Sequence, residues 1–493
     1  MKTESNVQSG FTESENSNLV VYDQSTLESG GKSRLRSVFL HPSLVMNAAS
    51  NWAALGVNMV IGFFLTPIII HYIGKSDYGI WTLVASIVGY YGILGLGVSS
   101  AITPYTARYI GQKDWQALNE LVNTALTFFM SIGLIALIAS FALAAPLASF
   151  FNIPPDRFAS FQHTMWLVGF AAAVGFPQNV FVSVIWGYEN YVASNCVSIA
   201  AALIRTGLTV WLLLEGFGLL GVALALAVSD TLSLGAIVIL CRTVDKHVQV
   251  RFFSVSRQML RILLLYGSTA FIIVISEMLR FQIDSAVIGK FVGIEAVAVY
   301  AIAAVLMRYF HRGVRDALKV LKPRFAVLYG SGRKEELQQT LFRSTIVASA
   351  LAFGGAALLI VFGRHLIHLW VGTKFTDAAP VLYVLVGALA FEMAQNPGIN
   401  VLYAVDRIRI LAGLWLVEAI FNVSLSLLLV GPFGIIGVAL GTAIPCVISK
   451  LLVLPYLVTR VASVPITKYY LTILLPALLA GALVLLVALF GGL

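Results

Sequence analysis

Charged residues are scarce in this sequence. Only 11% of its 493 residues are Asp, Glu, Lys or Arg, whereas 59% are hydrophobic. Ordinary soluble domains carry about 25% charged residues. A composition this apolar excludes a soluble multidomain enzyme of the same length.

Motifs that would indicate nucleotide or metal chemistry are also missing. No Gly-x-x-x-x-Gly-Lys-Ser/Thr phosphate loop occurs, so we do not expect ATP to be the direct energy source. The three cysteines, Cys196, Cys241 and Cys446, lie far apart in the chain. Their spacing predicts neither a disulfide framework nor a metal site, and we expect no metal and no cofactor.

The first 37 residues lack an apolar run and are rich in Ser and Glu. A segment of this kind is neither a signal peptide nor a membrane span. Its low hydrophobicity predicts a disordered tail over residues 1–37.

Long apolar runs fill the remainder of the chain. A membrane helix needs about 20 consecutive, mostly apolar residues, and thirteen such runs can be counted. They lie at 44–70, 80–105, 121–147, 164–186, 193–214, 219–241, 262–288, 296–321, 341–363, 379–403, 408–430, 434–456 and 469–491. The sequence therefore predicts an all-α, polytopic membrane protein.

The basic residues are distributed unevenly between the two sides of the predicted membrane. Of the 32 Lys and Arg, 24 lie in the tail or in segments on its side, and five lie in segments on the other side. Basic residues accumulate on the cytoplasmic side of membrane proteins, so we expect a cytoplasmic N-terminus. Topology thus accounts for the net charge of +9, and no nucleic-acid partner is expected.

The chain repeats itself at an offset of about 216–219 residues. Residues 104–111 align with 323–330, with Pro, Ala and Gly at matching positions, and Gly218-Leu-Leu-Gly-Val-Ala-Leu aligns with Gly434-Ile-Ile-Gly-Val-Ala-Leu. Six spans per repeat is an even number, so both halves enter the membrane in the same orientation, with a cavity expected between them. We predict a cytoplasmic tail (1–37), an N-terminal six-helix lobe (38–241), a basic amphipathic linker on the inner leaflet (242–261), a C-terminal six-helix lobe (262–460) and an additional membrane helix (461–493).

Seven ionisable residues lie near the middle of predicted spans. A charge at the centre of a membrane helix costs roughly 2.5–3.5 kcal/mol on insertion scales, so it persists where it faces a partner or a wet cavity. The seven are Arg205, Asp230, Glu277, Arg280, Arg308, Glu392 and Glu418. Together they predict a polar chamber for a charged cargo.

Two stretches of the chain resemble a known family of flippases. Residues 90–101 (Tyr-Tyr-Gly-Ile-Leu-Gly-Leu-Gly-Val-Ser-Ser-Ala) and 107–114 (Ala-Arg-Tyr-Ile-Gly-Gln-Lys-Asp) are similar to the second span and following loop of polysaccharide or oligosaccharide-lipid flippases. Residues 284–300 resemble the start of their second lobe. These proteins belong to the multidrug/oligosaccharidyl-lipid/polysaccharide exporter superfamily, and the likeness covers residues 40–460 in span count and loop pattern.

The resemblance implies transport without covalent chemistry. It implies that an undecaprenyl-pyrophosphate-linked glycan moves from the inner to the outer leaflet of a bacterial plasma membrane by alternating access, for surface polysaccharide synthesis. No catalytic residue is then expected. Membrane lipids and polysaccharide polymerase or export machinery are the partners that this reading implies.

The span at 296–321 carries the densest cationic signal. Arg308, Arg312, Arg315, Lys319 and Lys322 follow spacings of 4, 3, 4 and 3, which place them on one helical face. Such a ladder is suited to a pyrophosphate, because arginine forks pair with phosphate oxygens at two points. The alternative is a helix that ends near Arg312 and continues as a solvated, positively charged flank.

The span at 262–288 carries Glu277, Arg280 and Asp284 on one face. In a functional interpretation Arg280 binds the headgroup, and Glu277 or Asp284 exchanges protons. The alternative is a stripe that neutralises itself and has a structural role.

Four further charges lie in other spans. Arg205 and Asp230 lie at the same depth on consecutive spans, where mutual pairing and substrate contact are equally open. Glu392 and Glu418 are candidate cation or proton sites.

Two other functions compete with glycan flipping. A cation-coupled multidrug exporter of the same superfamily would favour acidic cavity residues, whereas here three arginines accompany four midplane acids. A membrane-embedded glycosyltransferase or polymerase would need large external loops, and the longest predicted here, around 148–163 and 364–378, are too short for that function.

Overall fold

The structure is a computed structural model that describes residues 42–251 and 254–471. Apart from turns and short connections, the described chain is helical and contains no strand. The predicted tail (1–37) and most of the predicted C-terminal helix (461–493) lie outside the described residues.

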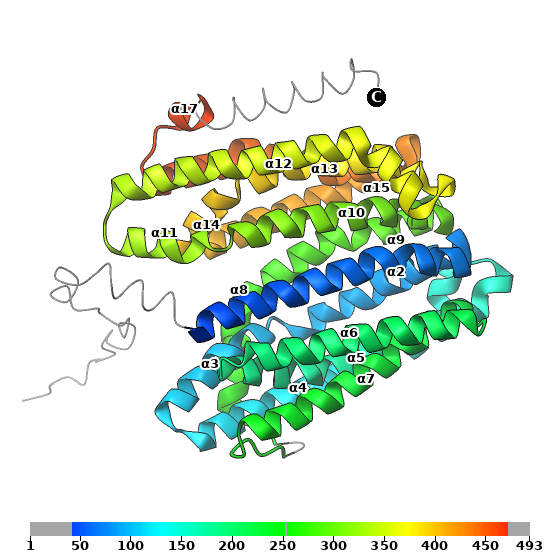
Figure 1. The fold of residues 1–493 in the computed structure, drawn as a ribbon, viewed down its shortest axis with the longest axis horizontal. Helices are drawn as coiled ribbons and strands as arrows, with labels where there is room; N and C mark the ends of the chain where they lie inside the picture. The colour runs from blue at the N-terminus through cyan, green and yellow to red at the C-terminus, as the bar shows by residue number, and fades with distance from the viewer. Residues whose placement is uncertain (1–41, 252–253, 472–493) are drawn as a thin grey trace, which may run out of the picture.

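The first half of the chain forms helices that occupy the lower part of Figure 1. They are α2 (Pro42–Gly89), the 3-10 helix η2 (Tyr90–Gly95), α3 (Ser99–Gln112), α4 (Trp115–Phe150), the 3-10 helix η3 (Pro155–Arg157), α5 (Phe158–Gly187), α6 (Tyr191–Leu214) and α7 (Gly218–Val244).

The second half begins with α8 and continues through the upper part of Figure 1. Its elements are α8 (Arg257–Phe281), α9 (Ile283–Phe291), α10 (Ile294–Leu318), α11 (Leu321–Gly330), α12 (Lys334–Val371), the 3-10 helix η4 (Thr373–Phe375), α13 (Ala378–Ala394), α14 (Asn396–Ala404), α15 (Ile408–Ile448), the π-helix η5 (Ser449–Val453), α16 (Leu454–Ala462) and α17 (Ile466–Tyr469). The two halves meet where α10 packs on α2 and where α8 contacts α3, α4 and η2.

Within the described residues, nine helices are long and apolar enough to cross a membrane, and the pair α13 and α14, bent by 43°, makes a tenth. Two of the nine, Met46–Gly95 and Ile408–Ala462, are interrupted by non-helical glycines, Gly74 and Gly434, where the chain reverses. Each of these two therefore contains two predicted spans. The first twelve predicted spans all coincide with helical segments, and the protein is an all-α, polytopic membrane protein.

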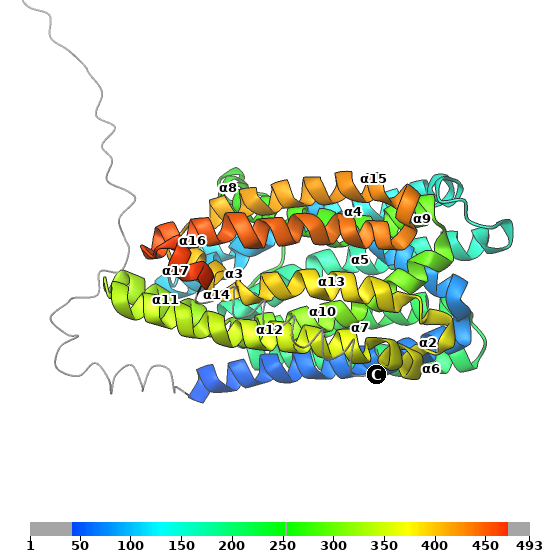
Figure 2. The ribbon, with the colours of Figure 1, turned by 90° about the horizontal axis from the view of Figure 1, so that it is seen from above.

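Helix α15 folds back on itself at Gly434, and its second arm runs beside the first and continues into α16 (Figure 2). Ser426 Oγ donates to the carbonyl of Val438 at 3.4 Å. A Cβ added at Gly437 would lie 2.0 Å from the carbonyl oxygen of Leu429. Glycine is therefore required at Gly437 for the two arms to approach this closely.

Five backbone positions with left-handed φ in the first half recur in the second half. The pairs, separated by 216 to 220 residues, are Gly74 and Gly293, Lys113 and Gly332, Asn152 and Gly372, Glu189 and Asp406, and Gly218 and Gly434. The helix ends thus recur at about the offset at which the sequence motifs recur. The lobe boundaries at 241 and 262 stay a prediction.

The described residues between the halves, 245–251 and 254–256, are not helical, and they contact α4. The side-chain amide of Asn119 accepts from the N–H of Gln249 at 2.7 Å and donates to the carbonyl of His247 at 2.9 Å. Asn123 accepts in the same way from the N–H of Arg251 at 2.6 Å. Among the described residues of the predicted 242–261 linker, only the two ends are helical, in α7 and α8, and the amides of α4 bond to the backbone of His247, Gln249 and Arg251 between them.

The close approach of the two arms of α15 leads to a stability prediction. The substitution Gly437→Ala should lower the stability of the purified protein by about 1–3 kcal/mol, the usual cost of forcing an atom into a packed contact. Gly413→Ala, in the same helix, is the matched control because a Cβ there meets nothing within 4 Å. Thermal unfolding in detergent would compare them, and equal melting temperatures for Gly437→Ala and the wild type would contradict the packing described.

Candidate functional site

A cavity of about 300 Å³ lies among α8, α10, α11, α13, α14 and α15. Eight ionisable side chains line it: Glu277, Arg280, His311, Arg315, Lys319, Lys322, Glu392 and Glu418. All of its lining residues belong to the second half of the chain. This cavity therefore lies within the second half, and the cavity predicted between the halves stays a prediction.

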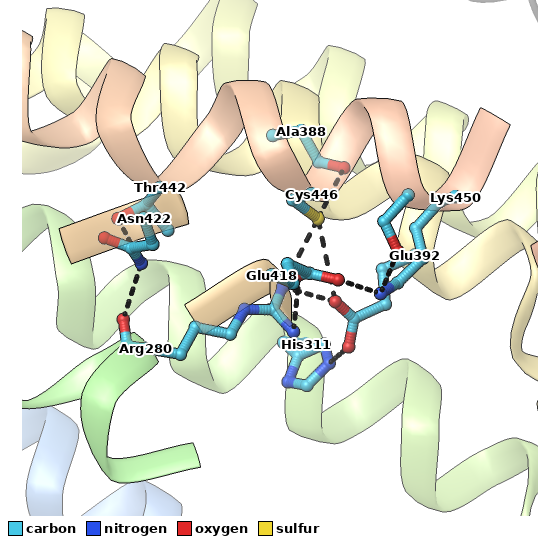
Figure 3. A network of polar contacts seen from close by, with 10 residues as sticks. Arg280, His311, Ala388, Glu392, Glu418, Asn422, Thr442, Cys446 and Lys450 are labelled. Atoms are coloured by element: carbon cyan, nitrogen blue, oxygen red, sulfur yellow. Dashed lines mark hydrogen bonds and ion pairs between the residues drawn. The ribbon is translucent and has the colours of Figure 1, made fainter. Parts of the chain in front are cut away.

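Four of these lining residues, Arg280, His311, Glu392 and Glu418, form a buried ion network with Lys450 (Figure 3). Arg280 donates to Glu392 and lies 3.5 Å from Glu418, and Lys450 donates to Glu418 at 2.6 Å. His311 Nε2 lies 3.3 Å from the second oxygen of Glu392. The two positive charges of Arg280 and Lys450 thus equal the two negative charges of the carboxylates, without counting His311.

The network changes the predicted role of Arg280. Its side chain is buried and held by two carboxylates, so it is not a free cation for a pyrophosphate. Breaking such a pair by removing one partner typically costs about 3–5 kcal/mol, because the other charge remains buried alone. The predicted candidates Glu392 and Glu418 serve as its counter-ions.

Cys446 completes the cluster. Glu392, Glu418 and Cys446 bring ligand atoms within 4.8 Å of one another, a spacing that suits a metal ion. Arg280 and Lys450 already neutralise both carboxylates, and Arg280 donates to the Cys446 sulfur at 3.3 Å. The donor set therefore favours internal ion pairing over a divalent cation.

The predicted stripe at Glu277, Arg280 and Asp284 is interrupted, since α8 ends at Phe281 and α9 begins at Ile283. Glu277 is exposed to the cavity, whereas Asp284 is buried and accepts from Tyr300 and Thr442. Neither carboxylate forms an ion pair with Arg280. The structure therefore contradicts the alternative of a self-neutralising stripe, because Arg280 pairs with Glu392 and Glu418.

The predicted ladder also divides into two parts. Helix α10 ends at Leu318, so Lys319 and Lys322 lie beyond it. Together with Arg315 they line the cavity, and Lys319 pairs with Asp316 at 2.7 Å.

Arg308 and Arg312 do not line this cavity. Both side chains are exposed, and neither forms an ion pair with a carboxylate in the part of the chain that the structure describes. They are free cations midway along and near the end of α10.

Arg205 and Asp230 pair with each other in the first half. Arg205 donates to Asp230 at 2.6 Å and to Ser229 Oγ at 3.0 Å. The sequence left open whether Arg205 and Asp230 pair with each other or contact the substrate, and the structure shows the mutual pair.

Sequence reasoning did not include Lys450, His311 or Cys446 among the site residues. A usable signal existed for Lys450, because folding 408–456 back at Gly434 brings its position opposite Glu418. No comparable signal exists for His311 and Cys446, which join the site through contacts between distant helices.

The buried lysine provides a direct test of the network. Lys450→Ala should lower stability by about 3–5 kcal/mol, since it leaves Glu418 with Arg280 alone. Removing both charges, as in Glu418→Gln with Lys450→Met, should recover most of the loss. Lys374→Ala, at an exposed position, is the control. Thermal unfolding of purified protein is the measurement, and a double variant as unstable as Lys450→Ala would argue against pairing.

Comparisons with known proteins agree with this architecture. A family model described as "Polysaccharide biosynthesis protein" matches residues 69–380. An uncharacterized membrane protein of Bacillus subtilis, EpsK, is 20% identical over 437 residues, covering 85% of this chain and 83% of that protein. An uncharacterized membrane protein of Methanocaldococcus jannaschii, MJ1068, is 28% identical over 38% of this chain and 37% of its own length.

Solved structures share the fold. The lipid II flippase MurJ in an inward closed conformation superposes with a TM-score of 0.70 at 15% identity, covering 88% of this chain and 97% of that one. A multidrug resistance MATE family transporter of the MOP superfamily superposes with a TM-score of 0.65 at 17% identity, covering 86% and 96%. The chain therefore belongs to the polysaccharide biosynthesis protein family, and it shares its fold with these two solved structures.

Proposed function

We propose that this protein moves a polyprenyl-pyrophosphate-linked oligosaccharide from the inner to the outer leaflet by alternating access, in a bacterial plasma membrane with the N-terminus in the cytoplasm. The family match and the fold shared with a lipid II flippase support this cargo class. The observation that carries the proposal is the free cation Arg308.

The Arg308 side chain is exposed, although the residues that precede it on α10 are almost all buried. Residues 297–307 of the same helix are buried, with one partly buried exception, Val305. The other midplane arginines, Arg205 and Arg280, are each held by carboxylates. A midplane cation without such a partner is costly unless it meets water or an anion.

A pyrophosphate is the anion that suits this position. The planar guanidinium of Arg308 offers a two-point fork for phosphate oxygens, and its neighbour Arg312 adds a second unpaired cation one turn away. Arg315 and Lys322 extend the positive charge into the cavity of the second half. The lipid tail would remain in the bilayer while the headgroup follows these cations.

The pairing pattern narrows the candidates for ion or proton coupling. Asp230, Glu392 and Glu418 are neutralised by Arg205, Arg280 and Lys450, whereas Glu277 and Asp284 have no cation partner within 4 Å among residues 42–251 and 254–471. Glu277 and Asp284 are therefore the acids that we propose for coupling. Polysaccharide polymerase or export machinery is the class of partner that would receive the flipped product.

The same pattern disfavours the multidrug exporter. A cationic drug needs unpaired acids in the cavity, but most of the midplane acids here are occupied by cations of the protein. The unpaired midplane arginine Arg308 would repel such a cargo.

The proposal predicts a specific binding defect. Arg308→Ala should weaken the binding of undecaprenyl pyrophosphate to purified protein by about tenfold or more, as expected for the loss of a charge-assisted hydrogen bond. Arg308→Lys should recover binding only in part, since an ammonium lacks the planar fork. In cells, Arg308→Ala should also abolish surface polysaccharide export at normal protein levels.

The exposed Lys374→Ala variant controls for the loss of one positive charge elsewhere. If Arg308→Ala combined with Arg312→Ala bound undecaprenyl pyrophosphate as the wild type does, the proposed cargo site would be wrong.

A further inference from the structure

A second cavity, of about 350 Å³, lies in the first half among α2, α5, α6 and α7. Its polar lining consists mainly of uncharged amides and hydroxyls, including Asn58, Gln178 and Ser198, with the indole of Trp186. Among the described residues that line it, only Arg205 and Asp230 are charged, and they neutralise each other.

The two cavities occupy equivalent places in the two halves. Five lining positions of one correspond to five of the other at offsets of 217 or 219: Asn58 and Glu277, Val182 and Ile399, Trp186 and Tyr403, Ser198 and Trp415, and Ala201 and Glu418. The nearby left-handed positions recur at the same offsets, 219 for Gly74 and Gly293 and 217 for Glu189 and Asp406. The same backbone arrangement therefore carries both cavities.

The side chains at the equivalent positions differ in charge. Where the second half has the acids Glu277 and Glu418, the first half has Asn58 and Ala201. The cationic arm from Arg315 to Lys322 has no counterpart among the residues that line the first cavity. A charged ligand would find no free partner there, and burying it would be unfavourable.

The hydrogen-bonding capacity of the first cavity is only partly used. Gln178 donates to Ser233 Oγ at 2.9 Å and Asn58 donates to the carbonyl of Ala54 at 2.8 Å, which leaves the amide oxygens of both to accept from a ligand. Ser198 is exposed to the cavity and forms no side-chain hydrogen bond with a described residue. A few such polar groups beside an aromatic wall are typical of a small-molecule site.

We propose that this cavity binds a neutral sugar residue of the cargo and so selects the glycan. The inference rests on the proposed function, since it assigns the uncharged part of the same lipid-linked molecule. Sugar hydroxyls donate and accept hydrogen bonds without charge, which matches the amides and Ser198. Trp186, which donates to Ser194 Oγ at 2.9 Å and stacks on Tyr191, adds an aromatic side chain to the cavity lining. In this proposal the cations of α10 bind the pyrophosphate of the cargo.

The test compares two kinds of probe on the full-length protein in nanodiscs. One is undecaprenyl pyrophosphate, and the other is the same lipid carrying a single glucose or N-acetylglucosamine. Wild-type protein should bind at least one sugar-bearing lipid about tenfold more tightly than the bare lipid, as two added hydrogen bonds would give. Asn58→Ala with Gln178→Ala should remove this advantage while leaving the affinity for the bare lipid unchanged.

A blocking variant and a matched control complete the design. Ser198→Trp, which copies the residue at the equivalent position of the second half, should fill the cavity and also remove the advantage of the sugar. Ser424→Ala, an exposed serine of α15 outside both cavities, should leave it intact.

Equal wild-type affinity for the bare and sugar-bearing lipids would overturn the sugar site. The sugar site would also be wrong if the Asn58→Ala with Gln178→Ala variant or the Ser198→Trp variant lost affinity equally for the bare and the sugar-bearing lipid. If the proposed flippase function were wrong, the result would differ. Undecaprenyl pyrophosphate without a sugar would then not bind, or its affinity would not change in Arg308→Ala.

Discussion

A charge inside an apolar helix bundle is stable only beside an opposite charge or water, and this requirement organises the second half of the protein. Arg280 on α8 is joined to Glu392 on α13 and to Glu418 on α15, and Lys450 joins Glu418 from the returning arm. Apolar surfaces alone specify helix orientation poorly in a membrane, because lipid tails attract them equally. The ion network therefore holds these helices in one arrangement.

The same requirement divides the arginines into two classes. Arg205 and Arg280 are held by carboxylates of the protein, whereas Arg308 has no such partner in the described chain and is exposed directly after the buried residues Leu306 and Met307. Charge alone did not distinguish them, since all three lie near the middle of predicted spans. Their different partners separate structural cations from the one that we propose for the cargo.

The two halves share turns but differ in charge. The recurrence of left-handed positions, such as Gly74 with Gly293, shows that the backbone ends its helices at corresponding places. On this common frame Asn58 occupies the position of Glu277, and Ala201 occupies that of Glu418. Substitution at equivalent positions thus produced one neutral and one charged cavity, a difference that gives the proposed cargo two chemically distinct contacts.

The all-α class, the first twelve membrane helices and the 216–219 repeat could be predicted from the sequence, because apolar run length and turn glycines are local properties of the chain. The sequence also indicated Arg280, Glu392 and Glu418 of the buried network, but not Lys450. The charge partners depend on the folded structure: Arg280 lies beside Glu392, 112 residues away, and forms no ion pair with Asp284, four residues away. Helices α8 and α9 are separated only at Gln282, and helix packing brings the distant carboxylates of Glu392 and Glu418 to the guanidinium. Partner choice depends on that packing, which periodicity along a single helix does not encode.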